Sequence, residues 1–242
     1  MELLIPDWPA SGNVRAFMTT RVGGVSTGPY AGLNLGEHTG DDPGAVAQNR
    51  VRLRTRLPAE PCWLTQVHGH AVCRADDSAA SRSADASVAR QGNVVCAVLT
   101  ADCLPVLLCD LRGSVVAAAH AGWRGLAGGV LEAAVAAMGA PPQELLAWLG
   151  AAIGPQAFQV GDEVRAAFVK DMPACAQAFV PDAQPDKWRV DIYRLARLRL
   201  ARAGVARVYG GGLCTVADAE RFYSYRRDGA TGRMAAVIWR GI

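Results

Sequence analysis

The segment VVCAVLTADCLPVLLCDLRGSVVAAAHAGWRG, residues 94–125, decides the fold predicted for this chain. It contains two apolar runs, Leu104–Asp110 and Ser114–Ala121, which are rich in Val and Leu. Both runs are too short to cross a membrane, and turn-forming residues at 111–113 separate them. The pattern therefore predicts two buried strands that form an antiparallel hairpin.

The hairpin brings a thiol close to an imidazole. If its loop is the two residues Leu111-Arg112, Cys103 lies directly opposite His120. Opposed residues of an antiparallel pair point to the same face, with Cβ atoms about 4.5–5.5 Å apart. Such a pair can share a metal ion or exchange a proton, and the alternative is a packed thiol beside a buried histidine. A slip of one residue would place the two side chains on opposite faces.

A third candidate ligand lies upstream, where the apolar run of WLTQVHGH ends at His68. We expect a strand over Cys62–Val67, so that His68 lies at the end of a strand and beside a turn. The spacing of His68, Cys103 and His120 matches neither the zinc fingers nor the HExxH helix. By spacing alone, the three residues form a weak motif.

The wording of several blocks is more specific than their spacing. Read in order, these blocks are TQVHG (65–69), TADCLPVLLCD (100–110), AAAHAGWRGL (117–126), GAAIGP (150–155) and RFYSYRRDGATGRMA (221–235). Together they resemble the bacterial laccase-domain (polyphenol oxidase) family, from about Thr19 to Trp239. That family is described as zinc-dependent purine nucleoside phosphorylases with adenosine deaminase activity.

The resemblance assigns residues to a site. It implies that His68, Cys103 and His120 hold the metal, and that Asn34 of LNLG and Arg50 of QNR face the substrate pocket. For Arg50 the alternative is one more exposed arginine on a basic helix. Two imidazoles and a thiolate suit Zn²⁺, and three protein ligands leave a fourth position open, as in catalytic zinc sites.

The resemblance also implies a reaction: phosphate-dependent cleavage of adenosine, inosine, guanosine or methylthioadenosine, with deamination of adenosine at the same site. Zinc lowers the pKa of a bound water to near 7, which suits attack at C6 of adenine. We expect phosphate at Arg50 and at the helix N-terminus beside Arg124, because guanidinium groups and backbone amides favour anions. Asp102 is a candidate for proton transfer or for supporting Cys103, or it is a turn residue.

Three alternatives remain at this point. The chain has four histidines (38, 68, 70 and 120), too few for a multicopper laccase, although Cu²⁺ at the zinc site is the alternative metal of a copper-binding polyphenol oxidase. A cysteine hydrolase of a cell-wall precursor would use Cys103 as nucleophile, His120 as base and Asp102 to orient it. A structural-zinc module needs a fourth ligand, for which His70 and Cys96 are the candidates.

Composition and the lack of targeting segments predict a soluble protein of the cytoplasm. The 242 residues are 51% hydrophobic, enough for a substantial core, and the net charge is only +3. The basic residues are scattered, so we expect no nucleic-acid partner. The small-molecule partners, a purine nucleoside and phosphate, are what the resemblance implies. The chain shows neither an export signal nor an apolar run long enough for a membrane span, so we expect no membrane partner. Its seven cysteines are an odd number at irregular spacing, and we expect them to be reduced.

We predict a single α+β domain over residues 1–242, with mixed or antiparallel sheets flanked by helices. Further strands are expected at Arg15–Thr20, His70–Arg74, Leu145–Gly150 and Arg207–Gly210, and a C-terminal hairpin at Phe222–Arg227 and Met234–Trp239. Helices are expected from Asp42 to about Arg56 and at Leu126–Met138, Val160–Val169 and Asp191–Ala203, and long loops at Arg21–Gly36 and Ser78–Gly92.

Overall fold

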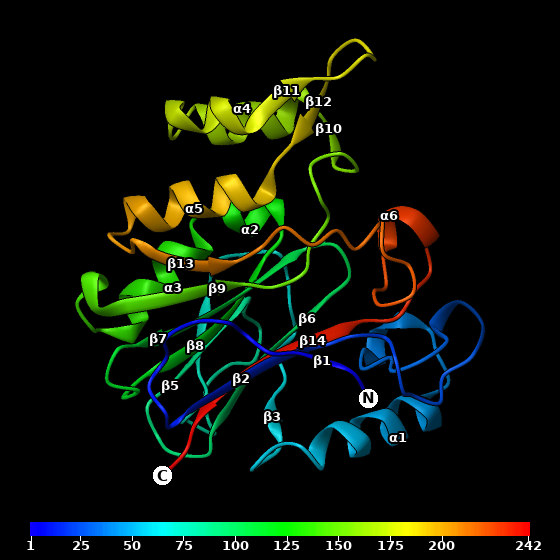
Figure 1. Ribbon diagram of the computed structural model, residues 1–242, viewed down its shortest axis with the longest axis vertical. Coiled ribbons are helices and arrows are strands. Elements are labelled where there is room, and N and C mark those ends of the chain that lie inside the picture. The colour runs from blue at the N-terminus through cyan, green and yellow to red at the C-terminus, as the bar shows by residue number, and fades with distance from the viewer.

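The computed structural model describes residues 1–242 and contains the predicted central hairpin (Figure 1). Strand β7 (Leu104–Asp110) pairs antiparallel with β8 (Val116–Ala121), and every residue of both strands is buried. They lie in the middle of a six-stranded sheet of order β13-β9-β7-β8-β5-β4. Its other strands are β4 (Val72–Arg74), β5 (Ala86–Ala89), β9 (Leu145–Leu149) and β13 (Arg207–Gly210).

The predicted register of the hairpin was wrong by two residues. Pro105, not Cys103, lies opposite His120. The turn is wider than two residues because the Asp110 carboxylate accepts hydrogen bonds from the Ser114 and Val115 amides, at 2.6 and 3.1 Å. Side chains alternate along a strand with a period of two, so an even shift leaves Cys103 and His120 on the same face.

A second, five-stranded sheet of order β1-β2-β14-β6-β3 packs face to face on the first. Its strands are β1 (Leu3–Leu4), β2 (Val14–Thr19), β3 (Pro61–Cys62), β6 (Val95–Thr100) and β14 (Met234–Arg240). Both sheets therefore have two buried faces. Leu107 and Cys109 of β7 point into the core between the sheets, whereas Val106 and Leu108 point to the helix side. This alternation explains why the strands read as continuous apolar runs.

Helices cover the two outer faces. Helix α1 (Pro43–Arg54), capped by Asp42, lies on the five-stranded sheet, where Leu53 joins Leu33 and Leu35 in a third core. Helices α3 (Val130–Met138) and α5 (Ile192–Arg202) cover the six-stranded sheet. The observed layers confirm the α+β class. None of the helices combines the length and the apolar composition needed to cross a membrane.

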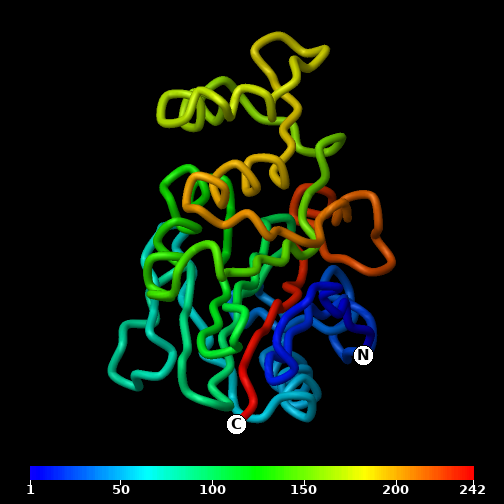
Figure 2. Tube along the Cα trace, turned by 60° about the vertical axis from the view of Figure 1, so that its left-hand side comes forward, coloured from blue at the N-terminus to red at the C-terminus, as the bar shows by residue number.

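A small three-stranded sheet lies at one end of the molecule, away from both chain termini (Figures 1 and 2). It has the order β10-β12-β11 and consists of β10 (Gln159–Gly161), β11 (Phe179–Pro181) and β12 (Lys187–Val190). Helix α4 (Asp162–Val169) packs beside it, so the helix expected from Val160 begins two residues later. Short 3₁₀ helices occur at Gly28–Tyr30, Glu37–Thr39, Pro142–Glu144 and Pro173–Ala178.

The predicted C-terminal hairpin was wrong. β14 pairs with β2 and β6, and Phe222–Arg227 forms no strand but leads into the short helix α6 (Tyr225–Asp228). Phe222 and Tyr223 are fully buried in the core between the two sheets. Their apolar, aromatic pattern, typical of a strand, thus reflects packing of an irregular segment.

Three further expectations were wrong in detail. Cys62–Val67 is not a continuous strand: beyond β3, the Gln66 side chain bonds the Leu99 amide and carbonyl at 2.7 and 2.8 Å, in place of a backbone partner. The expected loop Ser78–Gly92 contains β5, which pairs with β8. The helix expected at Leu126–Met138 is divided into α2 (Trp123–Ala127) and α3, because Gly129 adopts a φ of 94°.

Candidate active site

The structure brings His68, Cys103 and His120 together. Their ligand atoms all lie within 4.8 Å of one another, and the two imidazole rings meet edge to face with centroids 4.9 Å apart. His120 is buried, Cys103 is half-buried and His68 is exposed, so the cluster opens to solvent on one side. This arrangement, with three ligands and one open side, is what a catalytic metal site requires.

Positive φ angles in the backbone orient the side chains of His68 and Cys103. His68 has a φ of 59°, and Asp102, which precedes Cys103, has a φ of 88°. Residues other than glycine rarely adopt such angles, and they concentrate at functional sites. Gly122 lies against the cluster: a Cβ at this position would lie 2.9 Å from the Cys103 Sγ and 3.1 Å from the His68 Cδ2. The close approach of the backbone therefore requires glycine here.

The sequence analysis missed Asp85, which supports two of the three candidate ligands. Its buried carboxylate accepts hydrogen bonds from the backbone amides of Val67, His68 and Gly69, at 3.1, 3.0 and 2.7 Å. It also bonds the Nδ1 of His120, at 2.8 Å. Nε2 is therefore the ring nitrogen of His120 that is free to face the cluster, and the carboxylate fixes the tautomer as in many metal sites. Asp85 was overlooked because its segment was taken for a solvated loop.

The residues of the cluster also shift one another's pKa values. Burial alone would raise the pKa of Cys103, but His120 and His68 lower the pKa to about 6. Burial alone would lower the pKa of His120, but Cys103 and Asp85 raise this pKa to about 9. At neutral pH without a metal, the pair is therefore a thiolate beside an imidazolium. The thiolate is the form that binds metal, so only His120 must still release a proton.

This charge state predicts how zinc binding depends on pH. Between pH 7 and 9, the raised pKa keeps His120 protonated, and a bound metal must displace that proton. We expect the association constant for zinc to rise by about tenfold per pH unit over this range and to level off above it, with about one proton released per metal. Competition with a fluorescent chelator, and calorimetry in buffers of different ionisation enthalpy, measure both quantities. An affinity that stays constant from pH 7 to 9 would contradict the assigned charge state.

Asp102, the residue before Cys103, is linked to neighbouring segments through hydrogen bonds. Its carboxylate accepts a hydrogen bond from the Thr215 hydroxyl at 2.5 Å and another from the Arg226 amide at 2.7 Å. Its backbone carbonyl accepts the Ile153 amide at 2.9 Å. Both carboxylate oxygens are therefore engaged in holding α6 and its neighbours next to Cys103. Of the two roles considered from the sequence, this geometry favours support over proton transfer.

The glycine-rich loop before α1 carries Asn34, another of the predicted residues. Asn34 is fully buried; its side-chain oxygen accepts the Gly36 and Arg233 amides at 3.0 and 2.9 Å, and its nitrogen donates to Thr39 and Asp41, both at 2.9 Å. Asn34 thus shapes the loop from within, and its contact with substrate stays a prediction.

Arg50 is held at the base of the same loop. Its Nε donates to the Leu35 carbonyl at 3.0 Å, and its guanidinium pairs with Glu37 at 2.5 Å and lies 4.4 Å from the centre of the Trp63 ring. Its side chain is only 17% exposed, so it is not simply one more solvated arginine of α1. A role in binding substrate stays a prediction.

The remaining candidates lie elsewhere. Arg124 is exposed and stacks on Trp123, 4.5 Å from the ring centre, on a helix of five residues whose dipole is small. Neither His70 nor Cys96 belongs to the cluster, and Cys96 is fully buried in the core between the sheets. All seven cysteines are free, and only Cys103 and Cys214 are not fully buried.

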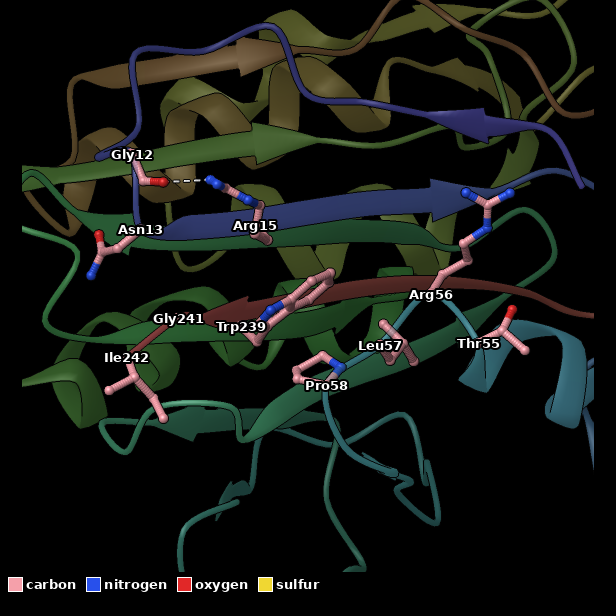
Figure 3. Close-up of a pocket in the computed structure, with 10 residues that line it drawn as sticks. All are labelled: Gly12, Asn13, Arg15, Thr55, Arg56, Leu57, Pro58, Trp239, Gly241 and Ile242. Atoms are coloured by element: carbon pink, nitrogen blue, oxygen red, sulfur yellow. Dashed lines mark hydrogen bonds between the residues drawn. The ribbon is translucent and has the colours of Figure 1, made fainter.

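An open cavity of about 800 Å³ lies apart from the cluster, and Figure 3 shows its lining. In this view Trp239 lies in the middle of the lining residues, between Arg15 and Pro58. Its lining includes no histidine, cysteine or acidic side chain. It therefore lacks the groups that would hold a metal or transfer a proton, and the His68–Cys103–His120 cluster remains the candidate site.

Comparisons with known proteins find relatives over nearly the whole chain. Residues 15–241 match the family described as multi-copper polyphenol oxidoreductase laccase. A Pseudomonas aeruginosa protein named purine nucleoside phosphorylase is 58% identical over 98% of this chain and 97% of its own. The Escherichia coli purine nucleoside phosphorylase YfiH is 52% identical over 98% of each chain.

Solved structures give the same assignment. A Neisseria meningitidis protein of the family DUF152 superposes with a TM-score of 0.94 at 53% identity, and all of both chains are covered. YlmD from Geobacillus stearothermophilus superposes with a TM-score of 0.86 at 33% identity, over 96% of this chain and 93% of its own. With a fold and nearly its whole length in common with these proteins, the chain belongs to the laccase-like polyphenol oxidoreductase family, whose similar members are named purine nucleoside phosphorylases.

Proposed function

We propose that this protein is a zinc-dependent purine nucleoside phosphorylase that also deaminates adenosine. The observation that carries the proposal is the three-ligand cluster His68, Cys103 and His120, open on one side, in a chain whose relatives are named purine nucleoside phosphorylases. In phosphorolysis the bond between C1′ and N9 breaks, phosphate oxygen bonds C1′, and the purine leaves with a proton. In deamination, adenosine and water give inosine and ammonia.

The donor set fits zinc. Cys103 is already a thiolate at neutral pH, and Asp85 directs the Nε2 of His120 toward the cluster. Zinc bound there supplies a Lewis acid and lowers the pKa of a water molecule to near 7. The same donor types also bind Cu²⁺, but no other group of three histidine, cysteine or acidic residues in the structure offers a further metal site. This supports a single-metal enzyme over a multicopper oxidase.

Residues of the chain itself perform the remaining tasks, which are binding phosphate and positioning the groups of the site. The glycosidic bond breaks through a state with oxocarbenium character, which an anion held on one face of the sugar stabilises. Arg50, fixed by the Leu35 carbonyl and paired with an exposed Glu37, is placed to exchange that carboxylate for phosphate. Asp85 keeps the His120 ring from turning, and Asp102 keeps α6 close to Cys103.

The test begins with metal analysis of protein purified without added metal. Nucleosides are then incubated with and without phosphate and separated by chromatography. We expect about one zinc per chain, hypoxanthine from inosine only when phosphate is present, and inosine from adenosine. Absence of hypoxanthine, together with copper-dependent oxidation of phenols, would support the oxidase alternative.

A substitution separates the two reactions. We expect Arg50→Ala to reduce phosphorolysis of inosine by about 10- to 100-fold, since it removes a charge-assisted contact to phosphate. Deamination of adenosine, which consumes no phosphate, is expected to fall much less. Initial rates at varied phosphate measure the effect, and Arg56→Ala, an exposed arginine just beyond α1, is the control. Equal losses in both reactions would remove Arg50 from the phosphate site.

A second candidate function, cysteine hydrolase, has one observation in its favour. Cys103, His120 and Asp85 form a thiolate, an imidazolium and an orienting carboxylate, as in cysteine-dependent hydrolases. Asp85 takes the place that the sequence analysis gave to Asp102. That chemistry needs no metal and does not need His68, so loss of activity in His68→Ala and on zinc removal would favour the phosphorylase.

A further inference from the structure

Arg233, the residue before β14, carries a half-buried positive charge that no carboxylate neutralises. Its Nη1 donates only to the backbone carbonyls of Thr231 and Gly232, at 2.9 and 3.0 Å, and no salt bridge includes it. Burial lowers the pKa of Arg233, while the negative groups Cys103 and Asp102 oppose that change. The guanidinium therefore lies in the field of the metal cluster. A cation that loses water without gaining a partner is costly, unless a ligand supplies the partner.

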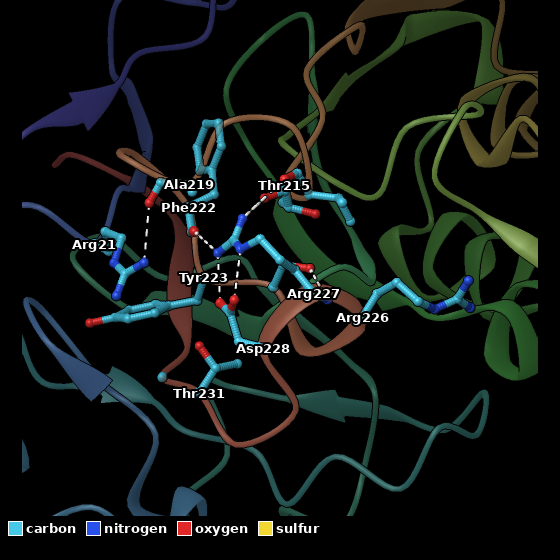
Figure 4. Close-up of polar contacts among 12 residues, drawn as sticks. Arg21, Thr215, Ala219, Phe222, Tyr223, Arg226, Arg227, Asp228 and Thr231 are labelled. Carbon is cyan, nitrogen blue, oxygen red and sulfur yellow. Dashed lines mark hydrogen bonds and ion pairs between the residues drawn. The ribbon is translucent and has the colours of Figure 1, made fainter. Parts of the chain in front are cut away.

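The turn that leads to Arg233 is held by hydrogen bonds and packing (Figure 4). The Arg227 guanidinium bonds the Thr215 and Phe222 carbonyls at 2.8 and 3.0 Å and pairs with Asp228 at 2.7 Å. Gly232 lies flat on the Tyr223 ring, since a Cβ there would be 2.6 Å from it. Arg233 thus starts from a fixed backbone, as a residue that positions a ligand must.

Arg233 and Arg50 hold the same short segment. The Leu35 amide donates to the Arg233 carbonyl at 3.2 Å, and the Leu35 carbonyl accepts the Arg50 Nε at 3.0 Å. His38 lies at the rim of this segment, where partial burial and then both arginines lower the pKa of its imidazole. The acidic group that pairs with Arg50 is Glu37, whose side chain is 70% exposed. Two guanidinium groups and a neutral imidazole thus gather around one short segment, residues 35–38.

We propose that Arg233, together with Arg50 and His38, forms the binding site of the phosphate co-substrate. When phosphate is absent, the Glu37 carboxylate pairs with the Arg50 guanidinium in its place. The proposal rests on the proposed phosphorylase function and adds the residues that hold its second substrate. A phosphate dianion accepts paired hydrogen bonds from each guanidinium and one from the imidazole. The two positive charges balance the two negative charges of the dianion, and its oxygens accept these hydrogen bonds. Exposed Glu37 can turn into solvent at little cost.

The test uses the zinc-loaded protein and the variants Arg233→Gln and Arg233→Lys. We expect Arg233→Gln to raise the KM for phosphate in phosphorolysis of inosine by about 10- to 100-fold, while the KM for inosine changes much less. Arg233→Lys keeps the charge and should recover part of the loss. Arg240→Gln, at the other end of β14, is the matched control. Glu37→Gln removes the competing carboxylate and should lower the KM for phosphate, and its exposed position leaves the fold intact.

A direct measurement of phosphate binding tests this site independently of the proposed phosphorylase function. Calorimetric titration with inorganic phosphate should show binding to the wild type and about 10- to 100-fold weaker binding to Arg233→Gln, whether or not inosine is cleaved. Wild-type phosphate binding without phosphorolysis would contradict the proposed function and leave the site standing. An unchanged phosphate affinity in Arg233→Gln, or a KM for phosphate in Glu37→Gln that rises, would overturn the site. It would also fall if Arg233→Gln lost affinity for inosine 5′-monophosphate and not for inorganic phosphate, because the guanidinium would then bind a nucleotide.

Discussion

Cys103→Ala is expected to abolish both phosphorolysis and deamination while the protein stays folded. The thiolate is one of only three candidate ligands, so its loss removes more than the roughly 100-fold in metal affinity that a supporting residue contributes. The fold should tolerate the change because Cys103 is half-buried just before β7 and is not a member of any of the apolar cores. An open catalytic site adds less to stability than a closed structural one.

The measurements are zinc content, turnover of inosine with phosphate, and the thermal midpoint of the metal-free chain. Cys214→Ala is the control, because Cys214 has similar burial but lies outside the cluster. We expect His68→Ala and His120→Ala to behave like Cys103→Ala. If Cys103→Ala unfolds and the bound zinc has four protein ligands, the protein is a structural-zinc module.

Asp85→Asn should weaken zinc binding by about 10- to 100-fold and destabilise the fold by about 1–3 kcal/mol. The carboxylate accepts hydrogen bonds from three backbone amides and from His120, and an amide side chain has only one oxygen to offer them. Its NH₂ group would meet donors, so the loop of His68 and the ring of His120 would both lose their support. Asp76→Asn is the control, because Asp76 also accepts backbone amides (those of Arg90 and Gln91) but does not touch the cluster.

The stability effect of Asp85 should also depend on pH. Burial would raise the pKa of Asp85, but hydrogen bonds from His120 and the loop amides hold the pKa below its ordinary value. The ionised group therefore stabilises the fold above about pH 4, and this contribution is lost as the pH falls through the folded-state pKa. The difference in unfolding free energy between wild type and Asp85→Asn, from urea denaturation of the metal-free chains, should shrink at acidic pH. A difference that grows on acidification would contradict this sign.

The sequence predicted the fold class and most strands and helices, because their periodicity and caps are local properties. Asp42 and Asp191, for example, cap α1 and α5 as expected. It could not predict that β14 would lie between β2 and β6, since pairing between distant strands depends on which apolar faces meet. The register error in the central hairpin arose from the Asp110 side chain, which widened the turn.

The same distinction holds for the site. His68, Cys103 and His120 could be identified from the sequence, because their residue types and the sequence blocks around them can be read directly from it. The structure brings the three residues together. Asp85 was missed because a carboxylate in a Ser/Ala segment looks solvated until the neighbouring strand β5 is seen to be buried. Arg233 was missed for a related reason: its lack of an acidic partner is a property of the folded surroundings.

The segment of His68 bridges the two large sheets, so its position depends on both of them. Gln66 is tied to Leu99 of the five-stranded sheet, while the amides of His68 and Gly69 are tied to Asp85, beside the six-stranded sheet. The Asp85 contacts place His68 beside His120, and the Gln66 contacts add a second anchor once the two sheets dock. We therefore expect the three side chains to reach their final spacing only when both anchors are in place.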